Sequence, residues 1–181
     1  MRTVARNLDA RQPPTLSRCP LPLRSRKTRL APSAPRRHDW RMTDVRAKVA
    51  QQFIEALPHC RALGMRVLSV GNGVAEIEMP YDTRFVGAPS TGVLHGGAGS
   101  TLLGPCGGAA VMSHPGSPSV TATLDLRIDY MRPATPGQTI RARAECYHIT
   151  RSVAFVRADA TDGDRETPVA SAAGAFTVAE Q

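Results

Sequence analysis

The chain has 181 residues and a formal net charge of +8, a length typical of one domain with a single core. The positive charge is concentrated in residues 1–41, which hold eleven basic and two acidic residues. Residues 42–181 hold twelve basic and thirteen acidic residues. A near-neutral remainder argues against a nucleic-acid-binding domain. No run of eighteen apolar residues occurs, so we expect no membrane-spanning helix.

Residues 1–41 are rich in Arg, Pro and Ser and lack an apolar period. Such a segment cannot bury enough apolar surface to offset its ordering entropy. We therefore expect a disordered basic, proline-rich extension, followed by a single domain at residues 42–181. An organelle transit peptide, or a tail that binds an anionic partner, is an alternative. We favour an extension upstream of a natural start at Met42.

The four cysteines, Cys19, Cys60, Cys106 and Cys146, are far apart and show no C-x-x-C spacing. We expect reduced thiols in a cytoplasmic protein, with no metal site and no disulfide framework. Cys106 is better explained as a small buried residue than as a nucleophile.

The expected domain begins with a helix. Thr43 is a candidate N-cap, apolar residues from Ala50 to Leu57, including Phe53, recur at helical spacing, and Pro58 ends the pattern.

Two strands, residues 63–70 and 74–80, follow around the turn Gly71-Asn72-Gly73, a strong hairpin signal. In the second strand, alternation directs three apolar side chains inward and two carboxylates to water. These are Ala75, Ile77 and Met79 on one side, and Glu76 and Glu78 on the other.

Residues 97–113 contain no charged side chain. A helix without a polar face must be surrounded on most sides. We therefore expect this segment to be a buried central helix, although Pro105 removes a backbone donor from its interior.

Residues 120–130 alternate between an apolar and a polar face, and they place Thr123, Asp125 and Asp129 together on the polar face. Further strands are expected at residues 138–149, 152–160 and 168–178, with turns at 133–137 and 162–164. In the first of them, one set of alternating residues should face inward: Ile140, Ala142, Ala144 and Cys146. The pattern predicts an α+β domain in which one curled antiparallel sheet wraps around a long central helix.

Three stretches carry a resemblance to a known family: GVLHGGAGSTLL (92–103), TLDLRIDYMRPATPGQTI (123–140) and the closing DGDRETPVASAAGAFTV. Together they resemble the hotdog fold, in particular the acyl-CoA thioesterases of the phenylacetic-acid-degradation (PaaI-like) type, over about three quarters of the chain. The resemblance implies an acyl- or aryl-acyl-CoA substrate, and no cofactor beyond the CoA of that substrate. It also implies a homodimer or homotetramer with sites at the dimer interface, and no nucleic-acid or membrane partner.

Gly96 and Gly97 allow close backbone approach at a helix start, where free N–H groups and the helix dipole favour negative charge. The resemblance implies that Gly97 N–H stabilises the oxyanion of the thioester and that His95 orients the thioester. A histidine satisfied at a strand–helix junction is the structural alternative.

Similar enzymes place Asp or Glu nine residues after the motif histidine, as nucleophile or general base. That position is Gly104 in this chain, which has no side chain to perform either role. Thr123 matches a position that is Ser or Thr in relatives, although a threonine chosen for the sheet is the alternative.

Asp125 is a candidate substitute acid on the face of Thr123, and Arg151 is a candidate ligand of the CoA phosphates. The alternative for Asp125 is an ordinary residue on the polar face of the sheet. Arg141 and Arg143 could bind the same phosphates, but charges on an exposed edge strand explain them equally well.

The sequence therefore predicts an acyl-CoA thioesterase in which water attacks a thioester polarised by Gly97. The alternative is a catalytically impaired acyl-CoA-binding protein that lacks the helix carboxylate, and a weaker one is recruitment to nucleic acid through the basic tail.

Overall fold

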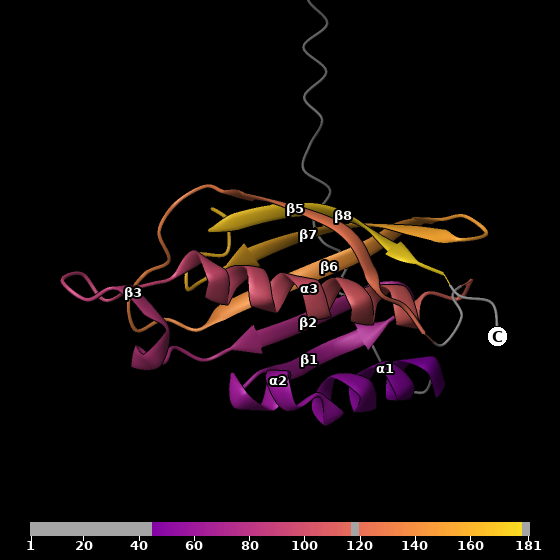
Figure 1. Cartoon of the computed structure of the whole chain (residues 1–181), viewed down its shortest axis with the longest axis horizontal. Coiled ribbons are helices and arrows are strands. Elements are labelled where there is room, and N and C mark those ends of the chain that lie inside the picture. The colour runs from indigo at the N-terminus through magenta and orange to yellow at the C-terminus, as the bar shows by residue number, and fades with distance from the viewer. Residues whose placement is uncertain (1–44, 117–119, 179–181) are drawn as a thin grey trace, which may run out of the picture. The chain divides into compact units, whose positions relative to one another are not determined.

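A computed structural model describes residues 45–116 and 120–178 of the chain. The expectations for residues 1–41 and for Thr43 lie outside these ranges. Two helices, two paired strands, a small hairpin, a long helix and four long strands follow one another (Figure 1). Their bounds are α1 Val45–Ala56, α2 Pro58–Ala62, β1 Arg66–Gly71, β2 Val74–Met79, a 3-10 turn Thr83–Phe85, β3 Val86–Ala88, β4 Val93–Leu94, α3 Gly96–Ser113, β5 Thr123–Tyr130, β6 Ile140–Ile149, β7 Val153–Thr161 and β8 Ala170–Thr177.

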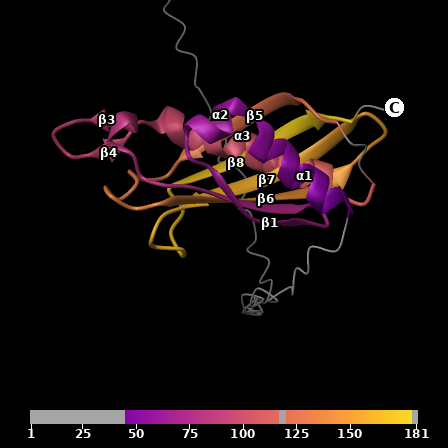
Figure 2. The same ribbon diagram turned by 90° about the horizontal axis from the view of Figure 1, so that it is seen from below.

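Six strands form one antiparallel sheet in the order β1-β2-β6-β7-β8-β5. Helix α3 packs against one face of this sheet, and α1 lies beside α3 and β1 on the same side (Figures 1 and 2). The predicted architecture, an antiparallel hotdog sheet around a long central helix, is confirmed.

The first helical segment differs from its prediction in two ways. Ala50 and Ile54 are buried as expected, but Phe53 is 43% exposed. Pro58 does not only end α1, because it is also the first residue of α2. Proline is well tolerated there, since the first turn of a helix needs no donor from its backbone nitrogen.

The hairpin between β1 and β2 turns where the sequence predicts, with positive φ at Asn72 (50°) and Gly73 (80°). Ala75, Ile77 and Met79 are fully buried, as the alternation predicts. The prediction that Glu78 faces water is wrong: the residue is 8% exposed because Arg66 and Arg141 bind its carboxylate from two neighbouring strands.

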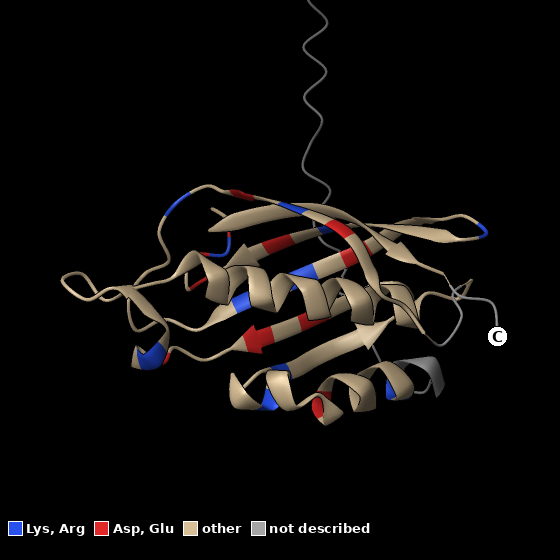
Figure 3. Cartoon of the chain, viewed as in Figure 1, with Lys and Arg blue, Asp and Glu red and all other residues tan. Residues whose placement is uncertain are grey.

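The core lies between α3 and the inner face of the sheet. Inward residues of β6 are buried as predicted: Ile140, Ala142, Ala144 and Cys146. Residues 96–113 of α3 carry no charge (Figure 3). Gly107 lets the helix approach β8 closely, because a Cβ there would lie 2.7 Å from the ring of Phe176. Helix α3 continues through Pro105 without a break.

Three cysteines, Cys60, Cys106 and Cys146, are free and buried. Burial raises the pKa of the Cys106 thiol to about 12 and that of Cys146 to about 11. Cys106 is therefore a core residue and not an activated nucleophile.

Among the described strands, β5 forms one end of the sheet and pairs only with β8. Apolar side chains on and beside β5 are exposed, including Leu124 at 57% and Tyr130 at 52%. None of the described helices is long and apolar enough to cross a bilayer.

Candidate active site

His95 is the N-cap of helix α3 and joins it to the small hairpin β3–β4. The imidazole Nδ1 accepts a hydrogen bond of 2.9 Å from Gly97 N–H. The backbone N–H of His95 donates to the carbonyl of Phe85 at 2.8 Å. Gly87 of the hairpin leaves room for the backbone of His95, since a Cβ at Gly87 would lie 2.8 Å from the Cα of His95. The hairpin thus fixes the histidine at the positive end of the helix dipole.

Two glycines of the first turn are required by close contacts. A Cβ at Gly97 would lie 2.9 Å from Nδ1 of His95, and one at Gly96 would lie 3.2 Å from Cζ of Tyr130. The exposed helix start is therefore flanked by the imidazole on one side and the phenol ring on the other. His95, Gly96 and Gly97 thus form the N-terminal end of α3.

Hydroxyl groups bind the carbonyl oxygens of this first turn. Tyr130 Oη donates to Gly96 O at 2.7 Å, while the hydroxyls of Ser100 and Thr101 donate to Gly97 O at 2.9 and 2.6 Å. The two helix hydroxyls are thus engaged with the backbone of their own helix, and neither is arranged as a nucleophile beside a base.

A cavity of about 410 Å³ opens beside the helix start. His95, Gly96 and Tyr130 form its polar part. The remaining wall is mostly apolar: Val93, Leu94, Gly99, Met131, Arg132, Pro133, Ala134, Ile140, Val169 and Ala170. This volume and lining are typical of a small-molecule site with few polar groups.

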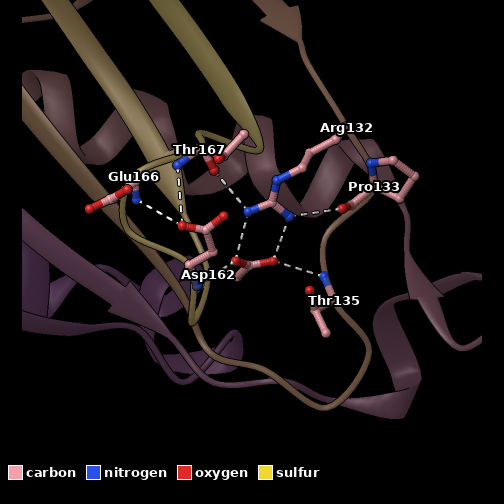
Figure 4. A network of polar contacts seen from close by, with 7 residues as sticks. Arg132, Pro133, Thr135, Asp162, Glu166 and Thr167 are labelled. Carbon is pink, nitrogen blue, oxygen red and sulfur yellow. Dashed lines mark hydrogen bonds and ion pairs between the residues drawn. The ribbon is translucent and has the colours of Figure 1, made fainter.

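The guanidinium of Arg132, the charged group of the cavity wall, is bound on both sides (Figure 4). It donates to both carboxylate oxygens of Asp162 at 2.8 Å and to the carbonyl of Thr167 at 2.8 Å. Thr135 N–H also donates to Asp162 at 2.9 Å. The hydrogen bonds from Arg132 hold the pKa of Asp162 well below its usual range. The cavity wall is therefore mostly apolar, and the charge of Arg132 is neutralised by its ion pair with Asp162.

Gly104 and Thr123 lie away from the helix start within the same chain. Gly104 is seven residues after Gly97, or about 10 Å along the helix axis at 1.5 Å per residue. Apart from its chain neighbours and the nearby backbone of its own helix, a Cβ built on Gly104 would meet no described atom within 4 Å, so no other element fills this position. Thr123 lies opposite Phe176 in the sheet, and the Phe176 ring reaches Gly107 in the second half of α3.

The prediction that Thr123 and Asp125 share a face is wrong. Strand β5 has a bulge between these residues, so Thr123 pairs with Phe176 whereas Asp125 pairs with Ala175. Directly opposed residues of antiparallel strands point to the same side of a sheet. Thr123 therefore lies on the helix side, and Asp125 lies on the outer face, away from Gly97.

Arg151 is exposed in the turn between β6 and β7. The first residue of β6, Ile140, lines the cavity, and the ten residues of β6 span about 30 Å. Arg151 is thus at the far end of the sheet from the helix start of its own chain.

Sequence reasoning missed the roles of Tyr130, Arg132 and Asp162. Tyr130 was assigned only to a strand face and Asp162 only to a turn. The signal available was the stretch YMRPA, in which a tyrosine and an arginine flank a strand end. Among the described residues, no three metal-binding side chains lie together.

Comparisons with known proteins identify relatives. Residues 91–169 match the family model described as the Thioesterase superfamily. A Halobacterium salinarum protein named as a candidate esterase is 30% identical over 142 residues, covering 75% of this chain and 93% of its own. The medium/long-chain acyl-CoA thioesterase YigI of Escherichia coli is 26% identical over 143 residues, covering 72% and 91% respectively.

Solved structures agree with these relatives. A crystal structure of a Pseudomonas aeruginosa protein is 37% identical and superimposes with a TM-score of 0.65, covering 73% of this chain and 98% of its own. The E. coli PaaI protein from the phenylacetic acid degradation operon shares the fold, with a TM-score of 0.60 at 21% identity over 71% of this chain and 92% of its own.

Proposed function

The chain belongs to the thioesterase superfamily, and we propose from this that it binds an apolar acyl-CoA thioester at the start of α3 and hydrolyses it. One observation carries the proposal: His95 and Gly96 at the start of α3 line the apolar cavity of about 410 Å³, and the next residue, Gly97, donates its N–H to His95 Nδ1. A carbonyl held there meets backbone donors, while the attached chain meets hydrocarbon. The acyl-CoA thioesterase activity named for the E. coli relative supports this substrate class.

His95 has a specific part in this mechanism. Its Nδ1 accepts from Gly97 N–H, so a thioester oxygen that takes this donor must displace the imidazole. The displaced Nδ1 then has a free lone pair beside the carbonyl carbon. Among the described residues that line the cavity, His95 alone has a side chain of a type that commonly serves as a general base.

Hydrolysis would then proceed in two steps. Water adds to the carbonyl carbon as its proton passes to His95, and the oxyanion binds Gly97 N–H at the positive end of the helix. Collapse of this intermediate expels the CoA thiolate, which recovers the proton from the imidazolium, and the acid product leaves. CoA is consumed as part of the substrate, and no separate cofactor is required.

A second copy of the chain would complete the site. The unpaired edge of β5 carries Asp125 and Arg127 on its outer face. Antiparallel pairing of two copies about a twofold axis at Leu126 places Arg127 opposite the partner's Asp125. It also places Tyr130, which contacts the start of α3, near the partner's Ala122, which lies toward the second half of the partner's helix. Gly97 of one copy would then face the partner's Gly104 and Thr123.

This pairing has a direct test. We expect Arg127→Asp to shift light-scattering mass toward the monomer, because it sets two carboxylates against each other across the strand pair. The charge-swapped double variant Asp125→Arg with Arg127→Asp should restore the wild-type mass. A monomeric wild-type chain, or a double variant no better than the single one, would contradict the pairing.

Gly104 favours a second candidate function, in which the chain binds acyl-CoA without hydrolysing it. A general base on this helix is absent, and no other element fills the position. An assay separates the two functions: release of free CoA from acyl-CoAs of four to sixteen carbons and from phenylacetyl-CoA, beside calorimetric binding of a thioether analogue. We expect turnover above buffer and saturable binding. Binding without turnover supports the second function. A chain that shows no turnover and no binding contradicts both functions.

A further inference from the structure

Tyr130 ends strand β5 with its ring against the first turn of α3. Cζ of the ring lies 3.2 Å from where a Cβ at Gly96 would be, and the phenol hydroxyl donates to the carbonyl oxygen of Gly96 at 2.7 Å. The residue also lines the cavity beside His95. Tyr130 is therefore the strand residue that touches both the cavity and the helix start.

The accepting oxygen belongs to a particular peptide group. A carbonyl oxygen and the N–H of the following residue are parts of one amide, so Gly96 O and Gly97 N–H share a single delocalised unit. A hydrogen bond donated to the oxygen draws electron density from the nitrogen, and hydrogen bonds in such chains strengthen one another. The Tyr130 hydroxyl thus acts on the donor that is expected to bind the oxyanion.

We propose that Tyr130 is a positioning residue that strengthens and aims Gly97 N–H as a hydrogen-bond donor. The proposal rests on the proposed function for its consequence in catalysis, but its physical content concerns the Gly96–Gly97 peptide alone. The bond becomes more valuable as charge develops on the thioester oxygen, because a polarised donor stabilises an oxyanion more than a neutral carbonyl.

The surroundings of Tyr130 hold it in this place. It pairs with Ala170 at the end of β5, and the next residue, Met131, donates its backbone N–H to the carbonyl of Val169 at 2.9 Å. The ion pair between Arg132 and Asp162 then fixes the chain that follows. A phenol anchored on one side to the sheet and on the other to the helix sets the direction of the Gly97 N–H bond.

Tyr81 offers a matched control. Its hydroxyl also donates to the carbonyl of a glycine, Gly92, at 2.8 Å. Gly92 lies before His95, so its peptide group does not contain the Gly97 donor. Tyr81→Phe removes a bond of the same kind and length near the site, and Tyr130→Phe removes the bond on the Gly96–Gly97 peptide.

The experiment compares the wild-type chain with both variants by two measurements, after circular dichroism has shown that each is folded. The first is the proton chemical shift of the Gly97 amide in nitrogen-15 spectra, which follows the strength of its hydrogen bond to His95. The second is kcat and KM for the acyl-CoA that the wild type hydrolyses fastest. Tyr130→Phe should move the Gly97 resonance upfield and lower kcat about tenfold, a fraction of the loss when an oxyanion donor is removed, with KM within about twofold. Tyr81→Phe should leave the Gly97 shift and kcat unchanged.

The outcomes separate this proposal from the proposed function. If the Gly97 resonance is the same in Tyr130→Phe as in wild type, the proposal is overturned whether or not the chain hydrolyses thioesters. An equal displacement of the resonance in both variants also overturns it. If the wild type is inactive while Tyr130→Phe alone moves the resonance, the thioesterase function fails and the action of Tyr130 on the donor stands.

Discussion

Arg132 and Asp162, thirty residues apart in sequence, form a two-pronged ion pair with both nitrogen–oxygen distances at 2.8 Å. The Asp162 side chain is fully buried and accepts further hydrogen bonds from the backbone N–H groups of Thr135 and Asp164. This single carboxylate ties the segment after β5 to the segment before β8. Both segments form walls of the cavity, so the pair determines the shape of the site without touching the helix start.

The ion pair predicts a pH-dependent stability. We expect Asp162→Ala to lower the free energy of unfolding by about 3 kcal/mol at pH 7, because it leaves a guanidinium and two N–H groups without their acceptor. Since folding lowers the pKa of Asp162, the contribution is complete above the unfolded pKa near 4 and is lost as the pH falls toward the folded value. Urea unfolding of both chains between pH 3 and pH 8 measures the difference. A difference in free energy of unfolding that stays constant below pH 4 would contradict the role given to Asp162. The control is Asp82→Asn, which breaks an exposed ion pair with Arg84.

Gly104→Asp should raise hydrolysis. No other element fills the position, since a Cβ there meets no described atom within 4 Å beyond its chain neighbours and its own helix backbone, and a carboxylate restores the base that relatives are expected to carry. We expect kcat to rise at least tenfold, below the gain of about 10²–10⁴ usual for a well-positioned general base, with a further gain when Pro105→Thr restores the backbone donor. Free-CoA release measures the effect.

Gly108→Asp is the matched control for this gain. It adds the same carboxylate one turn later on the same helix, where a Cβ would approach only Thr121, at 3.9 Å. A rise in hydrolysis with Gly108→Asp, or none in a folded Gly104→Asp chain, would show that position 104 does not correspond to the acid of relatives.

Two glycine-to-alanine changes in α3 should have different effects. Gly97→Ala forces a methyl group to within 2.9 Å of Nδ1 of His95, so we expect loss of the cap, about 1 kcal/mol of stability, and a fall in kcat/KM of about a hundredfold. Gly104→Ala should instead change the free energy of unfolding by less than about 1 kcal/mol, because the better helix propensity of alanine is opposed by contact of its Cβ with the ring of Pro105, the next residue in the helix. Thermal unfolding and the CoA assay together check both. Equal activity of the two variants would remove Gly97 from the site.

A smaller cavity should shorten the preferred acyl chain. Ala170 lines the cavity on the inner face of β8, whereas Ala172, two residues later on the same face, does not. Ala170→Val should raise KM for the longest accepted acyl-CoA about tenfold, the order of effect expected for one methylene of misfit, and leave short chains unaffected. Ala172→Val should not change chain-length preference. An equal change of chain-length preference in Ala170→Val and Ala172→Val would show that the acyl chain does not bind in this cavity.

Deletion of residues 1–41 should leave fold and ligand binding unchanged, because residues 45–178 supply the whole sheet, α3 and all residues of the cavity wall. Circular dichroism and calorimetric binding of a thioether analogue check this. Weaker binding by the shortened chain would give these residues a part in the site.

The sequence was sufficient where side-chain alternation alone determines the outcome. The inward rows of β2 and β6, including Ile77 and Ala142, follow from strict alternation in strands that pair without interruption there. The uncharged residues 97–113 likewise predict a buried helix. In each case the local pattern and the tertiary environment favour the same structure.

The sequence was not sufficient where a partner strand changes the local rule. The bulge in β5 that separates Thr123 from Asp125 is a property of the pairing with β8 and has no glycine to mark it. Burial of Glu78 depends on arginines from β1 and β6. The partnership of Tyr130 with Gly96 depends on a contact between residues 34 positions apart, which no local pattern encodes.

The buried thiols give the chain a built-in reporter of its own opening. Removal of residues 1–41 also removes Cys19, so every remaining cysteine is one that the fold encloses. A thiol reagent can then modify Cys106 only when α3 separates from the sheet, since its sulfur contacts carbonyls of β2 and β6. The rate of labelling at each cysteine would measure how often each layer of the core is exposed, with no reporter residue introduced by mutation.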